Sequence, residues 1–376
     1  MAYRMLVMVS LVCLGVSGVM LSTGHVQDAG PVLVAFFLLL AIGLRGNKDF
    51  KGFTFTLLIF AAVTVSMYYP AYFRSIDGFE LKSLIVPLLQ LIMFGMGTAM
   101  SLNDFSGVVK MPKGVLVGLV CQFTIMPIVG YGIANSFGFS PEIAAGIVLV
   151  GSSPSGLASN VMAYLAKANL ALSVTLTAVS TVLAPLMTPL LMKVFAGQFV
   201  PIDFWSMMLS IVKIVILPII AGLIFNRFFH GKANWLDKAM PIVSMGGIAV
   251  IIAIITAAGR DSLLAIGFFL IVAAIVHNAA GYFLGYWTCK ALKMPEQDCR
   301  TIALEVGMQN SGLASGIALE MGKVASIGLA PAIFGPWMNI SGSSLATWWR
   351  DKTPASTVPL FPDPEMIAKD KKDLVK

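Results

Sequence analysis

The chain has 376 residues, of which 58% are hydrophobic and only 11% are charged, and its mean hydropathy is +0.88. Soluble domains carry about 25% charged residues, so this composition excludes an ordinary soluble fold. The apolar residues instead form separate runs of about 15 to 25 residues, the length that an α-helix needs to cross a ~30 Å hydrocarbon layer. We therefore predict an all-α polytopic membrane protein.

Twelve apolar segments between polar breaks are predicted to span the membrane as helices. In chain order they cover residues 5–22, 30–44, 53–72, 83–101, 114–136, 141–166, 170–193, 204–226, 239–258, 262–289, 297–319 and 326–348. The first segment resembles a signal peptide, but it is longer than a usual hydrophobic region and no A-x-A site follows, so we expect a retained helix. The Pro-rich, charged tail at 351–376 is predicted to be a disordered cytoplasmic end.

Basic residues orient these predicted helices. Of the 25 Lys and Arg, 19 fall on the side of the membrane that holds the N-terminus, five fall on the other side, and Lys213 lies within a span. Cytoplasmic loops of membrane proteins are rich in Lys and Arg, so both termini are predicted to be cytoplasmic. The net charge of +7 then belongs to a rim beside anionic lipid headgroups, and no nucleic-acid partner is expected.

The sequence offers little for catalysis or for a bound cofactor. It has four Cys without a pairing pattern, three His, no HExxH motif and no GxxxxGK phosphate loop. These counts give no sign of a disulfide framework, a metal cluster or a bound nucleotide. His277 is the only histidine within a predicted span, and we interpret it as a helix-packing residue. We therefore expect neither an enzyme nor an organic cofactor.

The second half of the sequence repeats features of the first half. The pentapeptide SGLAS occurs at Ser155–Ser159 and at Ser311–Ser315, an offset of 156 residues, and amide side chains lie beside each copy. A Gly-Tyr pair and a Leu-Ala-Pro triplet recur in the same order. The repeat contains five predicted helices, an odd number, so the second copy crosses the membrane in the opposite sense. Inverted repeats are typical of secondary transporters, whose site lies near the midplane where broken helices meet.

Two predicted spans contain residues that interrupt a helix. The sixth span contains the sequence GSSPSG at 151–156, and the eleventh contains GMQNSG at 307–312. Such breaks free backbone carbonyls, which suit a cation, and expose half-helix N-termini, which suit an anion. The glycines alone could instead mark close packing seams between helices.

Glu305 is the only one of the 18 acidic residues that the predicted spans place deep in the membrane. A carboxylate there costs several kcal/mol unless it is paired, so it marks a functional site. Residues with side-chain oxygens lie near Glu305 in the predicted arrangement. Gln309 follows it by one helical turn, Ser159 and Asn160 lie at the repeated break, and Ser173 and Thr177 share one face of the next helix. Oxygen ligands with a single carboxylate suit a small monovalent cation and not zinc, copper or iron. A proton relay through Glu305 is the alternative.

Several motifs resemble the bile acid:sodium symporter family. They are FGMGTAMSLNDF at 94–105, CQFTIMP around Gln122, GSSPSGLASNVMAYLAKANLALSVTLTAVSTVLAPLMTP at 151–189, EVGMQNSGLA at 305–314, and NISGSSLATWW. The resemblance runs from about residue 53 to 350. It implies inverted five-helix repeats, with a panel domain packed against a core domain that holds two crossing discontinuous helices. Residues 51–350 would form this ten-helix core, preceded by an accessory transmembrane hairpin at 1–50.

The resemblance also implies two sodium ions as coupling ions. The first site would comprise Ser159, Asn160, Ser173, Thr177 and Glu305. The second would comprise the side chains of Gln122 and Gln309, with carboxylate or backbone carbonyl oxygens of Glu305, Val306 and Met308. All these positions hold the residue types that the family motif requires, which favours sodium over a proton as the coupling ion.

One position departs from the family pattern, which often reads Pro-Gly-Gly in the first break. Here the sequence is Pro154-Ser155-Gly156, and the added hydroxyl favours a small hydroxy or keto acid such as pantoate over a bile acid. The carboxylate of the anion is predicted to dock at half-helix N-termini whose backbone N–H groups are left unpaired by the breaks. The residues predicted to be near it are Ser153, Ser155, Gly156, Asn310 and Asn339.

We therefore expect a sodium-coupled symporter of a monovalent organic anion that works by alternating access. A proton-coupled organic anion transporter and a uniporter are the alternatives. The N-terminal sequence lacks a long Ser- and Arg-rich leader, which favours a bacterial inner membrane or another plasma membrane over a plastid. The expected partners are the organic anion and the lipid bilayer.

Overall fold

The computed structural model describes residues 2–47, 53–229, 234–350 and 352. These residues are helical apart from turns and one short β-hairpin, which confirms the predicted all-α polytopic class. The predicted tail at 351–376 lies outside the described residues except for Lys352. The predicted boundary between residues 50 and 51 lies outside them as well.

Eight helices among the described residues are long and apolar enough to cross a membrane, and they coincide with eight of the twelve predicted spans. The other four predicted spans are helical too. Of these, α3 (Thr54–Tyr68) is shorter and α17 (Leu329–Arg350) is less apolar. The remaining two are broken into half-helices, α8 (Pro141–Gly151) with α9 (Leu157–Leu165), and α15 (Glu296–Gly307) with α16 (Ser311–Glu320).

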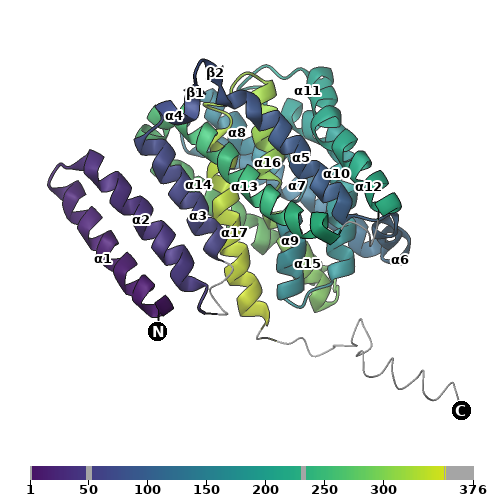
Figure 1. Ribbon diagram of the computed structural model, residues 1–376. Helices are drawn as coiled ribbons and strands as arrows, with labels where there is room; N and C mark the ends of the chain where they lie inside the picture. The colour runs from purple at the N-terminus through teal and green to yellow at the C-terminus, as the bar shows by residue number, and fades with distance from the viewer. Residues whose placement is uncertain (1, 48–52, 230–233, 351, 353–376) are drawn as a thin grey trace, which may run out of the picture.

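The first two helices form a hairpin at the edge of the bundle. α1 (Ala2–Ser22) packs along α2 (Val26–Leu44), and α2 packs on α3. Figure 1 shows the pair in purple beside the other helices. The outer face of α1 exposes large apolar side chains such as Met8 and Val12, as a helix facing lipid does.

A second group, the panel helices, consists of α3, α5 (Ile85–Ala99), α12 (Leu217–Phe229) and α13 (Asn234–Ala258), which pack on one another. Glycines allow α5 and α12 to approach closely. A Cβ atom on Gly97 would lie 2.2 Å from the Ile219 carbonyl oxygen, and one on Gly222 would lie 2.3 Å from the Phe94 carbonyl oxygen. Small residues at such contacts are how membrane helices pack tightly.

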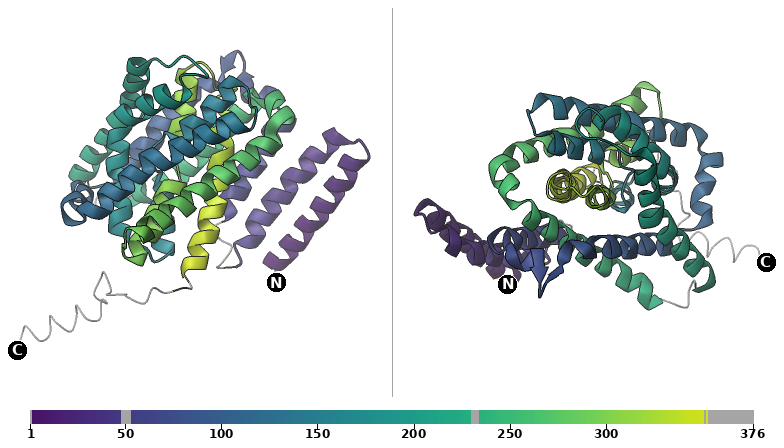
Figure 2. Two further views of the ribbon diagram at one scale, coloured as in Figure 1. Left: turned by 180° about the vertical axis from the view of Figure 1, so that it is seen from behind. Right: turned by 90° about the horizontal axis from the view of Figure 1, so that it is seen from above.

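A third group, the core helices, contains the half-helices and the spans that surround them. Its members are α7 (Pro112–Ser136), α8, α9, α10 (Leu170–Leu191), α14 (Arg260–Ala291), α15, α16 and α17. Seen from above, the yellow-green C-terminal helices lie at the middle of the molecule with other helices around them (Figure 2). The breaks are therefore enclosed by protein, which is where a membrane protein tolerates non-helical backbone.

Short elements connect the spans. They are α4 (Ala71–Arg74), β1 (Ser75–Ile76), β2 (Phe79–Glu80), η2 (Leu81–Leu84), η3 (Leu102–Ser106), α6 (Gly107–Lys110), η4 (Met192–Ala196), α11 (Phe204–Ile211) and η5 (Val212–Ile216). The strands β1 and β2 are antiparallel and turn at Asp77 and Gly78, whose φ angles of 48° and 84° suit an Asp-Gly hairpin turn. The predicted span 204–226 is interrupted by η5, a π-helical turn.

Candidate functional site

The two broken spans cross and pair through their backbones. The Gly156 N–H donates to the Met308 carbonyl at 3.1 Å, and the Asn310 N–H donates to the Pro154 carbonyl at 2.8 Å. An unpaired backbone group in an apolar interior costs several kcal/mol, so each break satisfies the other. This pairing fixes how α8 and α9 lie against α15 and α16.

One sequence-based expectation is therefore wrong. The predicted anion site assumed that the breaks leave the N–H groups of Gly156 and Asn310 unpaired, whereas both donate across the crossing. The two half-helix N-termini at the crossing also differ. Asn310 caps α16, since its Oδ1 accepts the Leu313 N–H at 3.0 Å. By contrast, α9 begins after Gly156 without a side-chain cap.

The carboxylate of Glu305 lies at the crossing and is 2% exposed. Four hydroxyl groups donate to it. Its Oε1 accepts from Ser159 at 2.6 Å and from Ser173 at 2.5 Å, and its Oε2 accepts from Ser155 at 2.6 Å and from Thr177 at 3.0 Å. Hydrogen bonds to an ionised group contribute about 1.5–3 kcal/mol each, so this shell favours a buried negative charge.

Local sequence explains why these hydroxyls converge. Asn169 caps α10, because its Oδ1 accepts the Leu172 N–H at 3.1 Å. The capped helix then presents Ser173 and Thr177, four residues apart, on one face. Asn160 Oδ1 also lies within hydrogen-bond distance of both hydroxyls, at 2.8 Å from Ser173 and 3.1 Å from Thr177, as an alternative acceptor. The structure thus brings together all five residues of the first predicted sodium site: Ser159, Asn160, Ser173, Thr177 and Glu305.

The residues of the second predicted site also meet beside Glu305. Gln122 on α7 donates through Nε2 to Gln309 Oε1 at 2.8 Å and to the Ser153 carbonyl at 3.0 Å. Gln309 Nε2 in turn donates to the Val306 carbonyl at 2.6 Å. The Met308 carbonyl faces the same crossing through its bond to the first break. Gln122 Oε1 is buried and has no hydrogen-bond partner, and a bound cation would satisfy it.

The electrostatics of the crossing suit a cation. Among the residues that the structure describes, no Lys or Arg forms an ion pair with Glu305. The carboxylate lies in the last turn of α15, so the C-terminus of that helix adds negative partial charge. The ligands available here are carboxylate, hydroxyl, amide and carbonyl oxygens. Such hard ligands suit a small cation that does not prefer nitrogen or sulfur.

The predicted anion residues do not form one open surface. Ser153 is buried and its hydroxyl donates to the Leu149 carbonyl at 2.8 Å. Ser155 contacts Glu305 instead, and Asn310 is 8% exposed. Asn339 is partly exposed, and its Nδ2 donates to the Gly335 carbonyl of its own helix at 2.9 Å.

Two polar residues of the crossing were not predicted from the sequence. Ser180 lies 3.3 Å from Ser155, oxygen to oxygen. Asn278 donates through Nδ2 to the Gly307 carbonyl at 2.8 Å, just as Gln122 donates to a carbonyl of the first break. Asn278 follows Gln122 by 156 residues, the offset of the repeated pentapeptide, so the repeat itself carried this signal.

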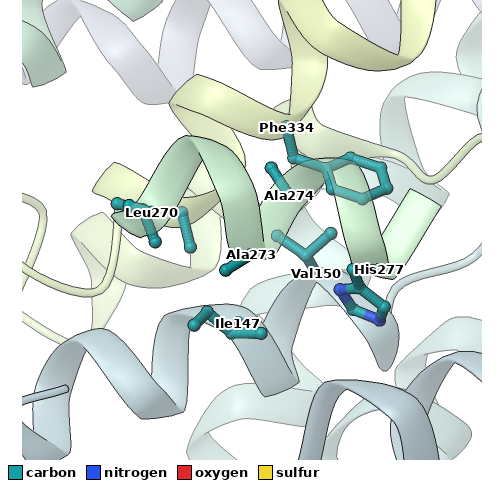
Figure 3. Close-up of a pocket in the computed structure, with 8 residues that line it drawn as sticks. Ile147, Val150, Leu270, Ala273, Ala274, His277 and Phe334 are labelled. Carbon is teal, nitrogen blue, oxygen red and sulfur yellow. The ribbon is translucent and has the colours of Figure 1, made fainter. Parts of the chain in front are cut away.

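His277 belongs to α14 and lines a very small cavity between α8, α14 and α17 (Figure 3). Its Nε2 is 2.9 Å from the Met126 carbonyl oxygen, and its ring meets that of Phe334 with centroids 5.6 Å apart. The cavity holds about 10 Å³ and is otherwise lined by apolar side chains, enough for roughly one water molecule. This environment supports the interpretation of His277 as a packing residue.

Known proteins resemble this chain over most of its length. A model of the sodium bile acid symporter family matches residues 86–266. The Bacillus subtilis protein named "Uncharacterized sodium-dependent transporter YocS" is 41% identical over 310 residues, which cover 82% of this chain and 94% of that protein. The chain belongs to the sodium bile acid symporter family. Proteins similar to this chain also occur in a plant and in an animal.

The Arabidopsis thaliana "Probable sodium/metabolite cotransporter BASS1, chloroplastic" is 33% identical over 71% of this chain and 66% of its own length. The "Ileal sodium/bile acid cotransporter" of Oryctolagus cuniculus is 34% identical over 65% of this chain and 72% of its own length. These members of the sodium bile acid symporter family are named as cotransporters. The chain is accordingly a membrane transporter and not an enzyme.

Proposed function

We propose that the protein is a sodium-coupled symporter of a monovalent organic anion. The observation that carries this proposal is the Glu305 carboxylate, which is buried without a basic partner among the described residues and is surrounded by hydroxyl and amide oxygens. The printed names of the relatives, which include a sodium-dependent transporter and a sodium/bile acid cotransporter, support sodium as the coupling ion.

Two sodium ions would share Glu305. The first would be held by Ser159, Asn160, Ser173, Thr177 and Glu305. The second would be held by Gln122, Val306, Met308, Gln309 and Glu305, and the unpartnered Gln122 Oε1 supports this assignment. Because both ions lie against the backbone pairing of the two breaks, their binding would hold the crossing in one shape.

The transported anion is proposed to be a small hydroxy or keto acid such as pantoate, with a bile acid as the second candidate. Relatives named for a metabolite and for a bile acid are compatible with either class. The uncapped N-terminus of α9 supports a docking place for a carboxylate, and Leu157 at that end is 37% exposed. Asn339 on α17 is the partly exposed amide among the predicted anion residues.

The proposed location is a cell membrane, with both termini in the cytoplasm. The first residues of α1 and the last residues of α17 lie at the same end of the bundle (Figure 1), which agrees with an even number of spans. The distribution of Lys and Arg supports the cytoplasmic assignment of that end.

The direct test uses purified full-length protein in detergent. Its melting temperature should rise with NaCl and not with equal concentrations of KCl or choline chloride, because a cation that binds only the folded state stabilises it. Proteoliposomes loaded with buffer should then accumulate pantoate or a bile acid only under an inward sodium gradient. Sodium-independent accumulation driven by a pH gradient would support proton coupling, and equilibration without accumulation would support a uniporter.

A further inference from the structure

The four hydroxyls around Glu305 share a second feature. Each has another acceptor within reach besides the carboxylate: Ser159 faces the Gly156 carbonyl at 2.7 Å, and Ser173 and Thr177 face Asn160 Oδ1. A hydroxyl has one proton and two lone pairs. When a cation lies against the carboxylate, the proton can turn to the second acceptor while a lone pair faces the cation.

Ser155 has the same arrangement. Its hydroxyl donates to Glu305 Oε2 at 2.6 Å and lies 3.3 Å from Ser180 Oγ. The Ser180 hydroxyl donates to the Thr177 carbonyl at 3.2 Å, so its oxygen is free to accept. A proton released from the carboxylate contact therefore has a defined acceptor, and Ser155 can present a lone pair just as Ser159, Ser173 and Thr177 can.

The backbone holds Ser155 in this position. Its two neighbours in sequence, Pro154 and Gly156, are those that pair with the second break, and Ser155 lies opposite Gln309 in that antiparallel bridge. The side chain is 1% exposed. A hydroxyl fixed in this way reaches the carboxylate and not a surface from which an organic anion could approach.

We propose that Ser155 is an additional ligand of the coupling cation beside Glu305, with Ser180 as the acceptor of its proton. This inference rests on the proposed sodium symport and replaces the prediction that Ser155 contacts the anion. Ser155 lies between the two predicted ion positions, because Glu305 serves both and Gln309 belongs to the second. Removing its hydroxyl therefore weakens cation binding without removing any charge.

The test measures sodium binding without any organic anion. In the purified full-length protein, the sodium concentration that gives half of the maximal thermal stabilisation should rise about 5- to 10-fold in Ser155→Ala, the effect of one lost neutral ligand. Ser180→Ala should shift it less and in the same direction. Ser66→Ala is the matched control, because that serine is also buried, lies on α3 away from the crossing, and donates its hydroxyl to the Val63 carbonyl of its own helix; its midpoint should stay within about twofold.

Different results would reject the role of Ser155 as a cation ligand and the proposed sodium symport. An unchanged sodium midpoint in Ser155→Ala, together with weaker pantoate or bile acid binding at saturating sodium, would assign Ser155 to the anion and overturn the inference. A lower melting temperature with an unchanged sodium midpoint would show a structural role and also overturn it. If Ser155→Ala does not fold, Ser155→Gly provides the same measurement in the extended break. Absence of sodium stabilisation in the unmodified protein would instead reject the proposed function.

Discussion

The arrangement of hydrogen bonds around Glu305 is unusual for a structural carboxylate. A buried acid is normally neutralised by an Arg or Lys, because an unpaired charge in a low-dielectric interior costs several kcal/mol. Here the partners are four neutral hydroxyls, which stabilise the charge without cancelling it. Such a site retains a net negative charge, which makes it able to attract a cation.

Substituting Glu305 with Gln should abolish sodium binding. The amide keeps the shape of the side chain but removes the single formal charge that both proposed ions share, and losing a buried counter-charge costs several kcal/mol. We expect no sodium-dependent rise in melting temperature and no sodium-driven uptake. Glu320→Gln is the matched control, because Glu320 is an exposed acid at the end of α16 and should retain both. Normal sodium stabilisation in Glu305→Gln would contradict the assignment of the carboxylate.

Gln122→Ala should have a milder effect. Its Nε2 joins α7 to both breaks, and its unpartnered Oε1 is the oxygen that we assign to the second ion. Removing one neutral ligand should raise the sodium concentration for half-maximal uptake about 5- to 10-fold and reduce the cooperativity of the sodium dependence, since one of two ions is weakened.

Gln198→Ala is the control for that experiment, because Gln198 is an exposed amide that bonds Asn135 at 3.4 Å. Its sodium dependence should match that of the unmodified protein. If Gln122→Ala weakened anion binding alone and kept the sodium dependence, the residue would belong to the anion path.

At the scale of helices, the sequence predicted much of the site but not how the breaks meet. Glu305 is predicted because it is the single acidic residue deep within a predicted span, and Ser173 and Thr177 because their spacing places them on one helix face. The antiparallel bridge at Ser155 and Gln309 could not be read from the sequence, because pairing between residues 154 apart depends on how the half-helices cross. For the same reason the sequence alone predicts that Ser155 lies near the anion, whereas its hydroxyl donates to the Glu305 carboxylate.

The predicted spans were accurate where hydropathy alone decides them. The internal breaks at residues 151–156 and 307–312 were also found, since Pro and Gly mark them. The π-helical turn at Val212–Ile216 was not predicted, because its residues are as apolar as those of a regular helix apart from Lys213. Local composition therefore gives no sign of this turn.

The core helices are joined at one end by Arg300. This buried side chain donates to Glu296 on its own helix and to the carbonyls of Ala166, Trp349 and Lys352. It thereby joins the ends of α9, α15 and α17. The Glu296 carboxylate that Arg300 contacts stays ionised, because burial acts to raise its pKa but hydrogen bonds from Lys290 and Arg300 outweigh that effect and hold the pKa below its ordinary value. The ends of these three core helices are therefore held together by hydrogen bonds to a single guanidinium group.

Close packing in the panel helices gives a prediction about stability. A Cβ on Gly222 would lie 2.3 Å from the Phe94 carbonyl oxygen, and both positions belong to backbones that cannot yield. Gly222→Ala should lower the free energy of unfolding by about 1–3 kcal/mol, as overpacking does, seen as a lower melting temperature. Gly132→Ala in α7 is the control, since nothing lies within 4 Å of its Cβ position, and it should leave stability equal or slightly raised. Equal melting temperatures for the two variants would contradict the close approach.

At the scale of the whole molecule, the orientation in the membrane can be tested directly. We expect the β1–β2 hairpin at residues 75–80 to be outside and the loop at residues 102–113 to be inside, with both termini inside, because most Lys and Arg lie on the latter side. Single cysteines introduced into each segment should react with a membrane-impermeant thiol reagent in intact cells only in the first case. Labelling of the 102–113 loop in intact cells would reverse the proposed orientation.

Coupling two sodium ions to one monovalent anion carries one net positive charge across the membrane, so uptake should be electrogenic. A membrane potential of 100 mV contributes ~2.3 kcal/mol per charge, and a tenfold sodium gradient contributes roughly 1.4 kcal/mol for each ion. Together these sustain an accumulation of roughly several thousand-fold. In proteoliposomes, an inside-negative potassium diffusion potential should therefore increase anion uptake at a fixed sodium gradient, and collapsing the potential should lower it. Uptake that follows sodium but ignores the potential would mean that one sodium ion accompanies each anion, and only one of the two proposed ion positions would then be occupied during transport.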